Sequence, residues 1–273
     1  MTVTSVVAIL SLAMGGAEPD TTRAKLDLPS GNGSVEPHGV EASTAEVSPS
    51  DDYLLHPPVL SVTVRGGAAF PMADSDFFDF VTDELTLEPQ DFDGAKVGFD
   101  LAVHISSRTD FISSFSYTHG SADSRYRHED EAIEQWTRLQ QAPLTAGLRV
   151  FPLGRGRQVG DFVWIPDSFR PYVGGAVGVV FYRLVQDGEW LDVGEDPNLP
   201  LEQRVFQDRF ESDGWGRALH ALAGVEWGIT PRFALTLEGR YQGATADLGD
   251  QFEGFEPLDL HGAHVTLGMT YAF

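Results

Sequence analysis

Hydrophobic and polar residues alternate with a period of two over most of the chain after residue 58, and clusters of Gly, Pro and Asp interrupt the alternation. This period is typical of β-strands, because successive side chains of a strand point to opposite faces. We find no helical period in this part of the sequence. The pattern predicts eight strands, at residues 59–70, 94–106, 110–119, 135–151, 169–183, 215–229, 232–244 and 260–273.

Each predicted strand is long enough to cross a bilayer at a tilt, which takes about 9–11 residues. The strands of soluble sheets are usually shorter, at about 5–6 residues. The alternation is clearest at 232–244, where Phe233, Leu235 and Leu237 share one face and Glu238 and Arg240 lie on the other. Eight such strands fit either a soluble ligand-binding barrel or an outer-membrane barrel, which carries its apolar face outward.

The lengths of the predicted connections favour the membrane barrel. Every second connection is long, whereas those at 107–109 and 230–231 are tight turns and the one at 152–168 is intermediate. Long loops at one end and short turns at the other are typical of outer-membrane barrels, with the long loops outside the cell. The even number of strands then places both termini in the periplasm. The long connections are at 71–93, 120–134, 184–214 and 245–259.

Aromatic residues at the two ends of the apolar face support the same choice. Amphipathic rings prefer the headgroup level of a membrane, so a barrel in lipid carries two aromatic belts. The predicted periplasmic belt contains Phe111, Phe169, Trp227, Phe233, Tyr271 and Phe273. The predicted outer belt contains Phe70, Tyr117, Trp136, Phe181, Trp215 and Tyr241.

Two motifs resemble small outer-membrane barrels of the outer-membrane protein A, X and W type. The chain ends in TLGMTYAF, in which Gly268, Tyr271 and Phe273 have the spacing of the C-terminal signal of that family, and residues 169–178 read FRPYVGGAVG. The resemblance covers residues 59–273. It implies an all-β, eight-stranded antiparallel up-and-down transmembrane β-barrel in the cell outer membrane. It also implies that the barrel-assembly machinery reads Gly268, Tyr271 and Phe273.

The chain before the barrel has a different composition. Residues 1–17 contain an apolar stretch followed by Gly15-Gly16-Ala17, which predicts a signal peptide even though no basic residue precedes Arg23. A short buried helix or strand is the alternative interpretation. Residues 18–57 are rich in Pro, Ser, Gly, Thr and Glu and predict a disordered linker. The barrel domain is expected at 58–273.

The net charge of −23 is concentrated in the predicted long loops. They hold most of the 41 acidic residues and only four basic ones, and they account for the whole net charge. Such a surface repels nucleic acid and attracts divalent cations or basic partners. The sequence contains no cysteine, which excludes disulfides, thiol nucleophiles and cysteine-bound metals. We expect no cofactor. The basic residues of these loops are Arg125, Arg127, Arg204 and Arg209.

Charged residues also occur on the predicted inner face. Buried charges must pair, because an unpaired one costs several kcal/mol, on the order of 3–5. The near balance of charge predicts a salt-bridged plug in the lumen and a structural or surface-interaction role, and a narrow passive pore for small solutes is the alternative. Nearby His104, His220 and His264 lack metal-ligand spacing. The predicted network is Arg65, Lys96, Arg149 and Arg240 against Asp100, Glu226 and Glu238.

Three weaker hypotheses concern the outer surface and its loops. His119 and Ser121, with Glu134 as the carboxylate, resemble the His-x-Ser pair of lipid A deacylases, which would perform acyl transfer. The aspartates of the first long loop offer oxygen ligands for calcium but lack the EF-hand spacing. Outward arginines match phosphate geometry, so three of them predict a lipopolysaccharide contact. The possible calcium ligands are Asp74, Asp76 and Asp79, and the arginines are Arg138, Arg183 and Arg217.

Overall fold

The computed structural model describes residues 53–72, 75–127, 133–191 and 205–273. All of these residues belong to one compact unit, Val47–Phe273. The predicted signal peptide at 1–17 and most of the predicted linker lie outside the described residues. No helix in the described parts of the chain is long and apolar enough to cross a membrane.

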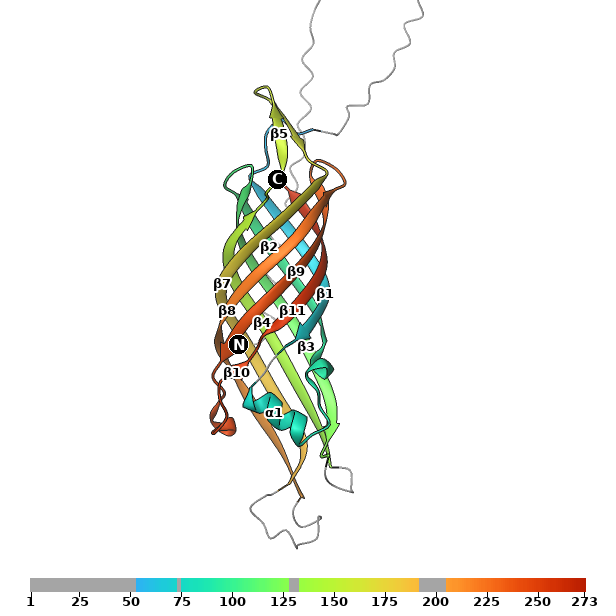
Figure 1. The fold of residues 1–273 in the computed structure, drawn as a ribbon, viewed down its shortest axis with the longest axis vertical. Helices are drawn as coiled ribbons and strands as arrows, with labels where there is room; N and C mark the ends of the chain where they lie inside the picture. Colours follow the sequence, from blue (N-terminus) through green and yellow to red (C-terminus); the bar gives the residue numbers. More distant parts are fainter. Residues whose placement is uncertain (1–52, 73–74, 128–132, 192–204) are drawn as a thin grey trace, which may run out of the picture. The chain divides into compact units, whose positions relative to one another are not determined.

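Eight long strands form a closed antiparallel barrel (Figure 1). Each strand pairs with its neighbours in sequence order, and β11 closes the ring between β9 and β1. The predicted eight-stranded up-and-down topology is therefore confirmed. The barrel strands are β1 (Leu60–Pro71), β2 (Gly94–His104), β3 (Thr109–Arg125), β4 (Glu134–Val150), β7 (Phe169–Leu191), β8 (Val205–Gly228), β9 (Phe233–Ala246) and β11 (Gly262–Ala272).

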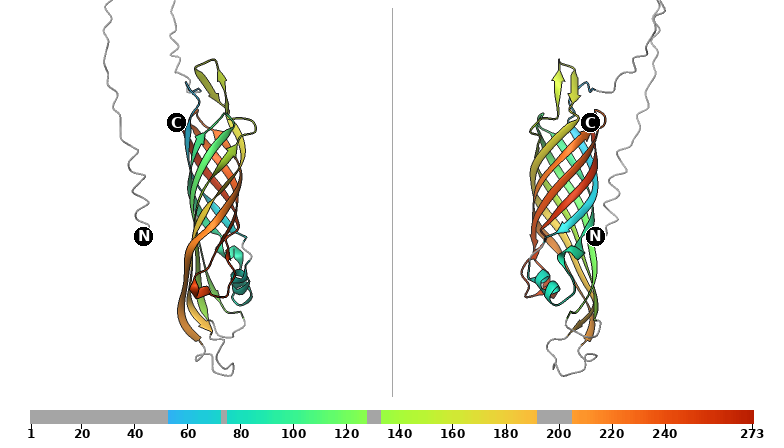
Figure 2. Two further views of the ribbon diagram at one scale, coloured as in Figure 1. Left: turned by 90° about the vertical axis from the view of Figure 1, so that its left-hand side faces the viewer. Right: turned by 45° about the vertical axis from the view of Figure 1, so that its right-hand side comes forward.

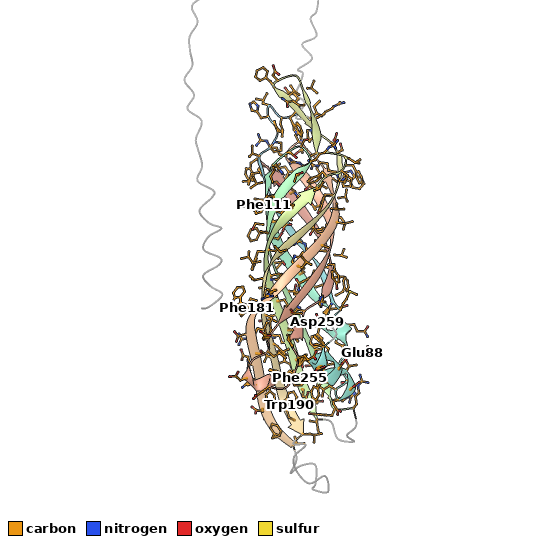
Figure 3. The ribbon with its side chains drawn as sticks, turned by 60° about the vertical axis from the view of Figure 1, so that its left-hand side comes forward. Glu88, Phe111, Phe181, Trp190, Phe255 and Asp259 are labelled. Carbon is orange, nitrogen blue, oxygen red and sulfur yellow. The ribbon has the colours of Figure 1, made fainter. Side chains whose placement is uncertain are left out.

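The two faces of the barrel wall follow the predicted alternation. Val64, Val177 and Leu267 point outward with 60% or more of their surface exposed, whereas Thr63 and Thr266 point inward and are buried. In Figure 3, Phe111 and Phe181 lie on the outside of the wall at two different heights. The barrel therefore has an apolar exterior and a polar interior, the reverse of a soluble protein.

Three strands, β3, β7 and β8, extend well beyond the predicted boundaries at the long-loop end. The strands β7 and β8 contain 23 and 24 residues and stay paired from Phe169–Trp227 to Leu191–Val205. The expected loop at 184–214 is therefore largely a β-hairpin, and much of 120–134 belongs to β3 and β4. Trp136 lies near the start of β4, where it pairs with Asp187 of the extended β7, rather than beside Phe181, which pairs with Ala142.

The other long connections contain short elements that the alternating pattern did not predict. The first holds the helix α1 (Asp76–Asp83) and the 3-10 helix η3 (Pro89–Phe92), and the last holds η4 (Asp250–Phe252) and β10 (Leu258–Asp259). The prediction that this part lacks helix is thus wrong for 76–83. An amphipathic helix of only eight residues is too short to show a clear helical period in the sequence.

A small hairpin projects from the opposite, short-turn end of the barrel, where β2 meets β3 and β8 meets β9 (Figure 2). It consists of β5 (Gly156–Val159) and β6 (Val163–Pro166) within the connection from β4 to β7. Leu54 exchanges two backbone hydrogen bonds of 2.8 Å with Trp164 of β6. The end of the predicted linker is therefore already paired before residue 58.

Candidate functional site

The centre of the lumen holds a cluster of buried ion pairs. Glu238 of β9 lies 3.1 Å from Arg65 Nη1 and 2.8 Å from Arg240 Nη2, and it accepts a 3.0 Å hydrogen bond from Arg240 Nε. Arg65 also pairs with Asp100 of β2. All four side chains are nearly inaccessible to solvent. The two carboxylates thus hold two guanidinium groups across strands β1, β2 and β9.

Tyr172 of β7 ties this cluster to the far wall. Its hydroxyl donates a 3.0 Å hydrogen bond to Glu238 Oε2, and its ring lies 4.8 Å from the guanidinium of Arg149. A second link crosses the lumen from β9 to β4, because Gln242 donates a 2.7 Å hydrogen bond to Gln141. The barrel interior is therefore filled at its centre by side chains from opposite walls.

Glycines on the inner face make room for the long basic side chains. Arg65 lies opposite Gly268 of β11 and Gly98 of β2. A Cβ at Gly268 would lie 2.7 Å from the carbonyl oxygen of Val64 and 3.0 Å from Arg65 Cβ. Gly268 therefore has a steric role inside the barrel. Its role in assembly, like that of Tyr271 and Phe273, stays a prediction.

Tyr271 and Phe273 lie on the outside of the barrel with three further aromatic rings. The Tyr271 ring lies 4.7 Å from both Phe233 and Phe273, and Phe169 lies 5.7 Å from Trp227. These rings gather at the short-turn end, as predicted for one aromatic belt.

A second cluster of buried charges lies at the short-turn end. Asp110 is fully buried and contacts His104 at 2.7 Å, Arg149 at 3.0 Å and Arg155 at 3.5 Å. Arg149 also pairs with Glu226 at 3.2 Å. The seven residues of the predicted lumen network therefore do not form one group, because Arg149 and Glu226 belong to this second cluster.

Several members of these clusters were not predicted from the sequence. Asp110 and Arg155 stand at strand ends, where the alternation no longer shows which face a residue occupies. Arg170 lies 3.4 Å from Glu226 and precedes a proline that obscures the pattern. One signal in the sequence indicated that Asp110 faces inward: it lies two residues before Ile112 and therefore on the same face of β3.

Lys96 differs from the other predicted lumen charges. It is buried, but none of the described residues forms an ion pair or hydrogen bond with its Nζ atom. Both ring nitrogens of His264 likewise lack a hydrogen-bond partner among the described residues, whereas His220 bonds to Gln242 at 3.1 Å. No group of three metal-ligating side chains occurs in the described chain.

An apolar core closes the barrel at the long-loop end. The helix α1 buries Phe77, Phe78 and Val81, and η4 supplies Phe252. Phe77 contacts Phe78, Phe252 and Phe255 with ring centroids 5.3, 6.0 and 6.2 Å apart. These residues pack against inward side chains of the extended strands. The wall supplies Leu139, Val180, Tyr182, Leu184, Ala218, Ala244 and Ala246.

The structure does not assemble the hydrolase residues. His119 and Ser121 both point outward on β3, and the His119 ring lies 3.4 Å from Gln140. Ser121 lies opposite Arg138, whereas Glu134 lies opposite Arg125. Four residues of β4 separate Glu134 from the partner of Ser121, a distance of about 13 Å at the usual rise of a strand. Glu134 therefore supplies no carboxylate to this pair.

The three outward arginines do not form one cluster. Arg138 lies 4.2 Å from the ring of Trp136, and Arg183, opposite Gln140, pairs with Glu211. Arg217 lies opposite Val179, four residues along β7 from Arg183. The lipopolysaccharide clamp predicted from all three thus lacks its geometry, because each arginine has a different setting.

The predicted calcium ligands are only partly described. Asp74 lies outside the described residues, and Asp76 and Asp79 occupy the exposed first turn of α1. Carboxylates in the first turn stabilise a helix through its dipole. That role accounts for their position without a metal.

Comparisons with known proteins give matches at the level of solved structures. No protein-family model matches the sequence, and no curated protein matches it significantly. The outer-membrane protein OprG from Pseudomonas aeruginosa is 14% identical, with a TM-score of 0.44 over 81% of this chain and 99% of OprG. The outer-membrane protein W of E. coli is 12% identical, with a TM-score of 0.36 over 80% and 100%.

The attachment invasion locus protein Ail of Yersinia pestis also matches. It is 12% identical, with a TM-score of 0.40 over 80% of this chain and 100% of Ail. All three are named as outer-membrane or attachment proteins, and the outer-membrane protein W carries the name of one type that the sequence motifs resemble.

Proposed function

We propose that this protein is an outer-membrane β-barrel with a closed lumen, which acts as a structural or surface-interaction protein through its long-loop end. The exterior of the barrel supports the location. Apolar residues such as Val64 of β1, Val177 of β7 and Leu267 of β11 face outward, and aromatic rings also lie on the outside. Exposed in water, such a continuous apolar band would drive aggregation, whereas in lipid it is solvated.

The filled lumen carries the functional part of the proposal. Ion pairs close it at the centre and at the short-turn end, and the apolar core closes it at the long-loop end. The pocket between the central charges and the apolar core has a volume of about 10 Å³, enough for one water molecule. A barrel filled in this way offers its surfaces rather than a channel.

The proposed orientation places the short turns in the periplasm and the extended strands outside the cell. Outer-membrane barrels have this asymmetry of short periplasmic turns and long outer loops. The acidic long-loop end then faces the medium, and the apolar wall contacts lipid and lipopolysaccharide acyl chains.

Ion conductance distinguishes the closed barrel from the narrow passive pore. In planar lipid bilayers we expect the purified protein to give no steady single-channel current, because buried side chains of the described residues occupy the lumen at the charge clusters and at the apolar core. A general porin inserted from the same detergent is the control for reconstitution. A reproducible open level in independent preparations would establish the pore instead.

The acidic surface predicts a salt-dependent interaction with cationic partners. A lysine-rich peptide is expected to bind the long-loop end at low salt and to be released at high salt, because the Debye length falls from about 30 Å at 0.01 M to about 3 Å at 1 M. Fluorescence anisotropy of the labelled peptide measures this effect. Replacement of Asp76, Asp79 and Asp83 with Asn should weaken binding, and these exposed side chains lie in no ion pair among the described residues. An affinity for the peptide that does not change with salt concentration would contradict an electrostatic interaction.

A further inference from the structure

A small pocket lies at the short-turn end, where the β5–β6 hairpin meets the barrel. Its volume is about 20 Å³. Trp164 and Pro166 of the hairpin form one side, and Ser61 of β1 and Thr270 of β11 belong to the opposite wall. The ionisable side chains that line it are His104, Arg155, Arg170, Glu226 and Arg232.

Positive charge exceeds negative charge around this pocket. Three arginines line it, Arg155 and Arg232 from two connections and Arg170 from β7, and Glu226 is the one carboxylate in its lining. Behind the lining, Arg149 and Asp110 add one charge of each sign. The group therefore has two more guanidinium groups than carboxylates. Arg149, Arg155 and Arg170 are buried or half-buried against only two carboxylates. Buried charge without a counter-charge is costly, so this excess favours an anion, and the exposed Arg232 adds to the positive charge.

Hydrogen-bond donors also remain free in the pocket. The side chain of Arg155 is 8% exposed, and its Nη2 atom donates to the carbonyl oxygen of Ser106. Its Nε atom has no hydrogen-bond partner among the described residues. Arg170 Nε lies 3.4 Å from Glu226 but makes no well-formed hydrogen bond within the described chain.

We propose that this pocket binds a phosphate group. The planar guanidinium of arginine matches the oxygens of phosphate, and a phosphate dianion balances the two excess charges better than a carboxylate does. The pocket has room for about one water-sized group. One phosphate oxygen therefore enters between Arg155 and Arg170, and the remaining oxygens stay at the mouth beside the exposed Arg232.

Thermal unfolding with added inorganic phosphate tests the site on the full-length protein in detergent. Phosphate should raise the melting temperature at constant ionic strength, because a ligand that binds only the folded state stabilises it. Arg232→Gln should weaken phosphate binding roughly tenfold or more, the usual effect of losing a hydrogen bond to a charged group. Arg232 is exposed and forms no ion pair among the described residues, so this variant keeps the fold.

Arg108→Gln is the matched control. Arg108 is an exposed arginine on the β2–β3 turn at the same end, and it does not line the pocket. The control should respond to phosphate as the unchanged protein does. Equal responses of the Arg232→Gln and Arg108→Gln variants would overturn the proposal.

Two further ligands identify the source of the phosphate. If a short-chain phosphatidylglycerol stabilises the protein and the Arg232→Gln variant loses this effect, the result supports the site and assigns it to a lipid headgroup. This holds whether or not free phosphate also stabilises the protein. Acetate that stabilises as well as phosphate would overturn the phosphate assignment. The absence of any Arg232-dependent stabilisation by phosphate or by the phospholipid would also overturn it.

Discussion

Replacing Glu238 with alanine is expected to lower the free energy of unfolding by about 3–5 kcal/mol, the usual cost of breaking a buried ion pair from one side. Glu238 accepts hydrogen bonds from Arg65, Arg240 and Tyr172 at 3.0–3.1 Å. Its removal leaves two guanidinium groups buried against Asp100 alone. The effect is large because neither arginine can turn to solvent inside the barrel.

Unfolding in urea, followed by the heat-dependent shift in gel mobility, measures this change. Glu253→Ala is the matched control, because Glu253 is an exposed carboxylate at the long-loop end and should cost almost nothing. If the Glu238 variant unfolds at the same urea concentration as the control, the central charges do not contribute to the stability of the closed barrel.

The second large effect is expected at the apolar core of the long-loop end. Phe77→Ala should cost about 3–5 kcal/mol of local stability, because it leaves a cavity among Phe78, Phe252 and Phe255. The barrel strands keep the hydrogen bonds between them, so the loss of stability concerns the packing of α1 and η4 against the barrel. Limited proteolysis should therefore cut near 76–92 faster, while the barrel stays folded.

Phe162→Ala provides the control for this experiment. Phe162 is 69% exposed in the β5–β6 turn, at the other end of the barrel. Its replacement should leave cleavage at 76–92 unchanged. The Phe77 variant should also remain non-conducting, because the central charges still fill the lumen. Unchanged proteolysis of the Phe77 variant would show that this core does not hold the loop.

The membrane-spanning half of the barrel was predictable because one simple pattern governs it. Apolar side chains face lipid and polar side chains face the lumen, so parity alone placed Arg65, Glu238 and Arg240 inside. The odd or even position of a residue along its strand does not tell which inward charges form ion pairs with one another. The separation of Arg149 and Glu226 from the central cluster depends on strand register and tilt, which bring Asp110 and Arg155 to them.

The extended strands were missed because the pattern reverses beyond the membrane. Tyr182 and Leu184 of β7 point inward and are buried, whereas Arg183 between them points outward and is exposed. Beyond the lipid, the outer face of each strand contacts water and carries polar residues, and the apolar residues lie on the inner face. A strand that changes its polarity partway along looks like the end of a strand and the start of an acidic loop.

The sequence by itself determined the eight strands, their topology, the apolar exterior and the acidic long-loop end. Those properties are local, because a period of two, a run of turn residues or a cluster of acids can be read without knowing its neighbours. Only the tertiary structure decided which inward side chains meet in the lumen. Contacts between Phe77 and Phe252, or between Arg155 and Asp110, join residues far apart in the chain, and their energies depend on burial that only the closed barrel creates.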